Sequence, residues 1–158
     1  MERKHVNYDD FSWSEILVPA TWETQGFKNY DGMAWYRKKV YIPDKYRGER
    51  LFLFLGRIDD VDETYFNGQL AGSTGSIEAQ SIRFSMDEDW LEWRAYRLES
   101  GSIRFGADNV IAVRVYDGWL HGGIYEGPVG IMTYETYREW RNKTGQGKRS
   151  FFERIFDN

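Results

Sequence analysis

The 158-residue chain contains no cysteine, and this absence excludes several kinds of site at once. Disulfide frameworks, thiolate zinc sites and cysteine nucleophiles all require that residue. Histidine is scarce too: the 2 copies, His5 and His121, lie far apart in the sequence, so we expect no transition-metal site. Folding must depend on a packed core, which a chain of this length can build as one domain without covalent staples.

Long apolar runs and concentrated charge are also missing. The longest apolar run, residues 51–55, is too short to cross a bilayer, and the first residues lack the apolar segment of a signal peptide. We therefore expect no membrane partner. The formal net charge is −4, with acidic and basic residues interspersed. Because phosphate binding needs a concentrated basic face, nucleic acid is not expected as a partner either.

Aromatic residues, in contrast, are abundant, at 18% of the chain. In a β protein most of them belong to the core and to cross-strand pairs. The 7 Trp and 11 Tyr nevertheless leave candidates for an exposed platform that stacks on sugar rings.

Short strand-like segments separated by turn residues fill most of the chain. Residues 51–55 are wholly apolar, which indicates a strand buried on both faces, whereas residues 109–116 alternate and present one apolar face. Asn67-Gly68 favours the positive φ values of a type I′ turn and closes a hairpin after residues 62–66. The pattern predicts an all-β fold, an antiparallel β-sandwich with jelly-roll topology.

The C-terminal part differs in composition. We expect a strand over residues 130–137, a polar stretch at 142–149 and a short amphipathic helix over 150–157, with a frayed tail as the alternative to the helix. The chain is accordingly divided into a jelly-roll domain at residues 1–138 and a polar linker with a short amphipathic segment at residues 139–158.

Several motifs occur in an order that resembles the sugar-binding jelly roll of glycoside hydrolase family 2, in the version also inserted in sialate O-acetylesterases. The resemblance covers roughly residues 8 to 132 and rests on the segments 18–22, 30–37, 56–62, 66–68, 109–117 and 122–128. It implies a galactose-binding-domain-like β-sandwich, normally an accessory module beside a catalytic domain. This chain has no room for a catalytic barrel of about 250 residues and no Gly-x-Ser-x-Gly motif.

The densest acidic cluster consists of Asp59, Asp60, Asp62 and Glu63. Paired carboxylates serve as acid and base in glycoside hydrolysis, but nothing in the sequence supplies the opposite wall of a cleft. A structural role, in which the aspartates accept backbone N–H groups, is one alternative. Since hard cations prefer oxygen ligands, a calcium site formed by Asp59, Asp60 and Asp62 is another. No cofactor is required for folding, and Ca²⁺ is the one cofactor that we anticipate.

The segment after residue 116 is the main candidate for a ligand surface, because binding groups usually lie on loops at the end of a rigid sandwich. Trp119 and Tyr125 are suited to stack on a pyranose, and three polar residues to bind its hydroxyls: Asp117, His121 and Glu126. The alternative is structural: Gly122 and Gly123 permit a tight crossover, and Ile124 and Tyr125 fill the core.

Tyr30 and Asp31 form a second candidate sugar contact. The resemblance places their loop near the rim of the catalytic pocket in the related enzymes. Trp35 and Tyr36 alternate on the following strand, so one of the two must face inward.

The expected function is a non-catalytic carbohydrate-binding or accessory module, with a carbohydrate as partner and a catalytic domain or another protein as a further partner. The alternative is a structural or protein-interaction domain, or a fragment of a larger glycosidase or sialate O-acetylesterase. The family context suggests a bacterial periplasmic or secreted location, although the sequence shows no signal peptide.

Overall fold

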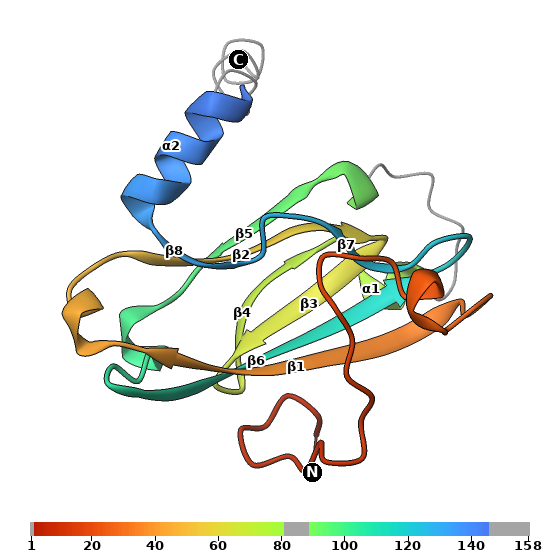
Figure 1. Cartoon of the computed structure of the whole chain (residues 1–158), viewed down its shortest axis with the longest axis horizontal. Coiled ribbons are helices and arrows are strands. Elements are labelled where there is room, and N and C mark those ends of the chain that lie inside the picture. Colours follow the sequence, from red (N-terminus) through yellow and green to blue (C-terminus); the bar gives the residue numbers. More distant parts are fainter. Residues whose placement is uncertain (1, 81–88, 146–158) are drawn as a thin grey trace.

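Two antiparallel sheets form a β-sandwich in the computed structural model, which describes residues 2–80 and 89–145 (Figure 1). The first sheet has the order β1 (Gly32–Ile42), β6 (Ala107–Asp117), β3 (Val61–Phe66), β4 (Gln69–Thr74). In the second, β2 (Leu51–Asp59) is flanked by β5 (Trp93–Arg97) on one side and by β7 (Gly123–Glu126) and β8 (Gly130–Thr133) on the other. The predicted all-β sandwich is confirmed.

One short helix precedes the first strand, others lie between strands, and one longer helix follows the last strand. The short ones are η1 (Glu23–Gln25), η2 (Asp44–Tyr46), α1 (Ile77–Gln80), η3 (Asp89–Leu91) and η4 (Ser100–Ser102), and the longer one is α2 (Tyr134–Thr144). None of the helices in the described ranges is long and apolar enough to cross a membrane.

The predicted hairpin joins β3 and β4 through Asn67 and Gly68, which have φ values of 49° and 83°. The Asn67 side chain also ties the hairpin to β6, because its Oδ1 accepts from the Val110 backbone at 2.9 Å and its Nδ2 donates to Asn109 Oδ1 at 2.7 Å. The hairpin turn and β6 are therefore joined directly by side-chain hydrogen bonds.

The core lies between the sheets, and β2 is buried on both faces as predicted. Leu51, Leu53 and Leu55 point into this core. Phe54 points outward and is nevertheless fully buried, because α2 covers it: the ring of Trp140 lies 4.5 Å from that of Phe54, edge to face. The outer surface of β2 is thus closed by aromatic packing against a helix.

The strand expected over residues 130–137 is shorter than predicted. β8 ends at Thr133, whose Oγ1 accepts from Thr136 N at 3.3 Å and so caps α2, while Gly145 ends the helix at φ 75°. The predicted boundary between residues 138 and 139 falls inside α2. The division into a jelly-roll domain and a C-terminal linker stays a prediction. The helix expected over residues 150–157 lies outside the described residues.

Candidate functional site

A buried ion pair joins the two sheets beside the candidate site. Arg94 and Asp62 have fully buried side chains, and Arg94 Nε donates to Asp62 Oδ1 at 3.1 Å. The rest of the guanidinium donates to the backbone oxygens of Asp60 (2.6 Å), Glu92 (2.6 Å) and Asp89. The guanidinium of Arg94 therefore stabilises the fold through these internal hydrogen bonds.

The prediction that Asp62 shares a cation site with Asp59 and Asp60 is corrected. The alternation along β3 turns Asp62 inward, where it accepts from Tyr96 OH at 2.9 Å and from Thr64 Oγ1 at 2.7 Å. Burial raises the pKa of Asp62, and the adjacent Arg94 opposes that shift. With these partners on both of its oxygens, Asp62 is a structural residue.

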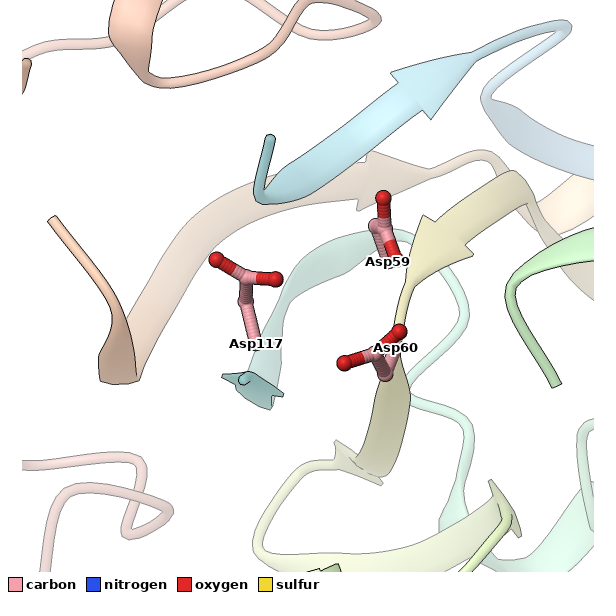
Figure 2. Close-up of side chains that lie close together, drawn as sticks. All are labelled: Asp59, Asp60 and Asp117. Carbon is pink, nitrogen blue, oxygen red and sulfur yellow. The ribbon is translucent and has the colours of Figure 1, made fainter. Parts of the chain in front are cut away.

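A different aspartate joins Asp59 and Asp60: Asp117, the last residue of β6. Carboxylate oxygens of the three residues lie within 4.8 Å of one another, and Figure 2 shows the side chains converging from the end of β2, the β2–β3 junction and the end of β6. Asp60 Oδ2 accepts from Gly118 N at 3.0 Å, which fixes one side of this acidic cluster. Two distant segments of the sequence therefore build one site at the end of the sandwich.

Asp117 is the most deeply placed member of the acidic cluster. It is fully buried; Oδ1 accepts from Trp119 N at 3.3 Å, whereas Oδ2 has no hydrogen-bond partner within residues 2–80 and 89–145. Burial raises the pKa of Asp117 to about 7, and repulsion from carboxylates such as that of Asp60 adds to the shift. A buried acceptor without a partner is destabilising by about 1–3 kcal/mol.

Asp59 is similarly perturbed. Burial is the largest cause, and the hydrogen bond and repulsion from Asp60 add to it, so that the pKa of Asp59 rises to about 8. In the described part of the chain, no lysine or arginine forms an ion pair with any of the three aspartates. The surrounding protein thus disfavours ionisation of the carboxyl groups in the acidic cluster.

The loop after β6 exposes the predicted aromatic group. Trp119 is 69% exposed and Leu120 is 63% exposed, and His121 is also exposed. The loop is anchored at Gly122, whose oxygen accepts from Trp22 N at 3.1 Å. A Cβ at Gly122 would overlap the Trp22 indole, so this glycine is required for the crossover, as the structural alternative predicted.

Glu23 belongs to the same end of the sandwich and was not predicted. Its Oε1 accepts from Gly122 N at 3.2 Å, while its buried Oε2 has no partner among the described residues. No local pattern in the sequence marks this glutamate, because its role depends on a loop 99 residues further along the chain.

The remaining predicted ligand residues have structural partners or lie apart. Tyr125 OH donates to Trp90 O at 2.7 Å, and Glu126 pairs with Arg57 at 2.9 Å. Tyr30 is partly exposed, with its OH bonded to Met33 O at 2.7 Å. Asp31 is exposed and raises the pKa of Asp117, which places it near the acidic cluster.

Comparisons with known proteins lead to β-glucuronidases. No family model matches the chain. A β-glucuronidase from Formosa agariphila is 24% identical over 156 residues, an alignment that covers 78% of this chain and 14% of that protein. The solved structure of Bacteroides uniformis β-glucuronidase matches with a TM-score of 0.62 and 21% identity, over 78% of this chain and 15% of the other.

Two further solved structures agree. A β-glucuronidase from glycoside hydrolase family 2 matches with a TM-score of 0.62 and 21% identity over 77% of this chain and 15% of the other. The Ruminococcus gnavus β-glucuronidase matches with a TM-score of 0.53 and 19% identity, over 66% of this chain and 16% of the other. At these identities the structural matches show a shared fold, and they do not show the expected link with sialate O-acetylesterases. The chain is similar, in sequence and in its β-sandwich, to a domain-sized part of glycoside hydrolase family 2 β-glucuronidases.

Proposed function

We propose that this chain is a non-catalytic carbohydrate-binding module that accompanies the catalytic domain of a glycosidase. The observation that carries the proposal is the acidic cluster of Asp59, Asp60 and Asp117 beside the exposed indole of Trp119. Carboxylates that lack a cation partner, next to an exposed aromatic ring, supply the hydroxyl acceptors and the stacking surface that recognition of a sugar requires.

The geometry favours binding over hydrolysis. Glycoside hydrolysis needs two carboxyl groups that face each other across the scissile bond, about 5–9.5 Å apart. The oxygens of the acidic cluster lie within 4.8 Å of one another and Asp117 is fully buried, so a sugar has no place between them. The β-glucuronidase activity of the relatives belongs to much longer proteins, and we propose that none of it resides in this chain.

A hard cation fits the acidic cluster. Ca²⁺ binds oxygens at about 2.3–2.6 Å, so oxygens on opposite sides of the ion are up to about 5 Å apart. The oxygens of the acidic cluster lie within 4.8 Å of one another and so fit inside that sphere. The buried, unpartnered Asp117 Oδ2 is accessible to a small ion more readily than to a sugar hydroxyl. The calcium ligands that we propose are thus Asp59, Asp60 and Asp117.

The ligand that suits this end of the sandwich is a neutral glycan. Trp119 would stack on the sugar ring, and hydroxyls would reach the bound ion, Asp31 and the loop backbone. A uronate is disfavoured, because Glu23 and Asp31 add further negative charge around the three aspartates. Affinity should be modest, since a shallow surface offers little buried area to offset the cost of association.

A second candidate function is docking of the catalytic domain on the same end. The loops that contain Trp22 and Gly122 are hydrogen-bonded to each other, and both expose apolar side chains: Phe27, Tyr30, Trp119 and Leu120. Exposed apolar groups on adjacent loops are typical of a protein interface.

The test is a titration of the chain with neutral mono- and oligosaccharides, with and without Ca²⁺, followed by tryptophan fluorescence. We expect binding that requires Ca²⁺ and that Trp119→Ala and Asp117→Asn abolish, while Trp90→Ala, at another exposed tryptophan, preserves it. No response to any neutral glycan at millimolar concentration would contradict sugar binding and favour the docking function.

A further inference from the structure

The outer face of the sheet that contains β1, β6 and β3 carries a cavity of about 480 Å³, away from the acidic cluster. Its floor comes from the sheet and its wall from the N-terminal segment, which forms a loop on the outer side of β1 (Figure 1). The lining combines three aromatic rings, from Tyr8, Trp35 and Tyr65, with three cationic side chains, from Arg3, Lys4 and Arg114.

The rings of Trp35 and Tyr65 stack on each other, and Lys4 Nζ lies over the Tyr65 ring, 5.2 Å from its centroid. Trp35 lies on β1 and Tyr65 on β3, and β6 runs between these strands. Strands that flank a common neighbour are about 9.5 Å apart. The ring centroids are only 6.0 Å apart with an interplanar angle of 24°, so the rings lean toward each other over β6, where Ala112 is fully buried.

Positive charge exceeds negative charge in the cavity. Arg114 stands opposite Trp35 in the β1–β6 register, and its Nη1 donates to Glu63 Oε2 at a long 3.3 Å. Within the described ranges, no hydrogen bond engages Arg114 Nη2. Arg3 is exposed and its guanidinium has no ion-pair partner there, while Lys4 pairs with Glu2, the one carboxylate of the lining, at 2.9 Å.

The wall of the cavity is fastened to the sheet. Arg37, on β1, is almost fully buried; its Nε pairs with Asp10 at 2.8 Å and its Nη1 donates to Arg3 O. Its guanidinium also lies 5.4 Å from the centroid of the Tyr8 ring. These contacts hold the N-terminal segment in place, so the cavity is a formed part of the fold.

We propose that this cavity binds an acidic sugar, a pyranose that carries a carboxylate or a sulfate group. The apolar face of the ring lies on Trp35 and Tyr65, and the anionic group reaches Arg114 and Arg3, because guanidinium groups bind such anions with strong charge-assisted hydrogen bonds. The volume falls within the range of about 300–1,000 Å³ that is usual for small-ligand sites. The acidic cluster would repel the same ligand, so the cavity and the acidic cluster select sugars of different charge.

The test uses the full chain at low salt, titrated with methyl β-D-glucuronide, glucose 6-sulfate, methyl β-D-glucoside and inorganic sulfate in separate experiments monitored by NMR. We expect both acidic sugars to bind, and we expect added salt to lower their affinity. The glucoside and inorganic sulfate should bind with an affinity at least about tenfold lower. A comparison of the affinities for the glucuronide and for glucose 6-sulfate shows which anionic group, carboxylate or sulfate, the cavity prefers. Arg114→Gln should lower the affinity by about tenfold or more.

Matched variants separate this site from the acidic cluster. Trp119→Ala and Asp117→Asn should leave the affinity for the acidic sugars unchanged, as should Lys39→Gln, an exposed lysine on β1 outside the cavity. Arg3→Gln, at an exposed side chain that the fold does not need, should weaken binding even if Arg114→Gln fails to fold. The proposal is overturned if the glucoside or sulfate alone binds as tightly, if no acidic sugar binds, or if Arg3→Gln has no effect.

Discussion

The guanidinium of Arg94 and the carboxylate of Asp62 meet at 3.1 Å between the two sheets, with neither side chain exposed. This pair explains why an aspartate in the middle of an acidic segment is not available to a cation. Its neighbours Asp59, at the end of β2, and Asp60, at the β2–β3 junction, take part in the acidic cluster instead.

Breaking this pair should destabilise the fold strongly. Arg94→Met leaves Asp62 charged and buried without a cation, so we expect a loss of about 3–5 kcal/mol in the free energy of unfolding, measured with urea. Arg47→Met removes the exposed pair with Asp44 and should change the same quantity by less than about 1 kcal/mol. Similar losses in the two variants would contradict the role of the buried pair.

The acidic cluster should make stability fall as pH rises. The folded-state pKa values of Asp59 and Asp117, about 8 and about 7, lie above the ordinary value of 3.8. Between about pH 4 and 8 the folded state therefore binds more protons than the unfolded state, and the free energy of unfolding decreases with increasing pH. Urea unfolding at pH 5 and pH 8, without added metal, measures this slope.

Two comparisons test the origin of that slope. Asp117→Asn removes one of the titrating groups and should flatten the decrease, because an amide carries no charge at either pH. Added Ca²⁺ should restore stability at pH 8 more than at pH 5, since the ion binds the deprotonated carboxylates. A slope that is unchanged in Asp117→Asn would assign the pH dependence to other groups.

Gly122→Ala should disturb the loop that carries Trp119. The added Cβ would overlap the Trp22 indole, and relief of such overpacking costs about 1–3 kcal/mol. Gly101→Ala is the control, because no atom lies within 4 Å of the position of its Cβ. Thermal unfolding and near-ultraviolet circular dichroism should change for Gly122→Ala alone.

Trp140→Ala should loosen α2 from the outer face of the second sheet. The indole makes edge-to-face contacts with Phe54 at 4.5 Å and with Trp93 at 4.8 Å, and each such pair contributes about 0.5–1.5 kcal/mol. We expect a loss of about 2 kcal/mol in unfolding free energy. The exposed Glu139→Ala on the same helix should show little change; equal effects would mean that the helix does not stabilise the sandwich.

Local patterns predicted the fold, and contacts between distant segments decided the site. Asn67-Gly68 carries its turn geometry in two adjacent residues, so the hairpin was predictable. Asp117 joins Asp59 and Asp60 only because β6 pairs with β3, and no spacing in the sequence shows that meeting. The structural role of Asp62 was unpredictable for the same reason, because it depends on the pair with Arg94, which lies far away in the sequence. The helix α2 was missed although Tyr134, Tyr137 and Trp140 follow a helical spacing of three residues.

The most direct test of the central claim is chemical-shift mapping of the full chain with a neutral glycan and Ca²⁺. The account predicts shifts in the amides of Gly118, Trp119 and Gly122, because Gly118 and Gly122 donate to Asp60 and Glu23 and Trp119 donates to Asp117. Neutral-glycan shifts confined to the outer face around Trp35, or no shifts at all, would contradict carbohydrate binding at the acidic end of the sandwich.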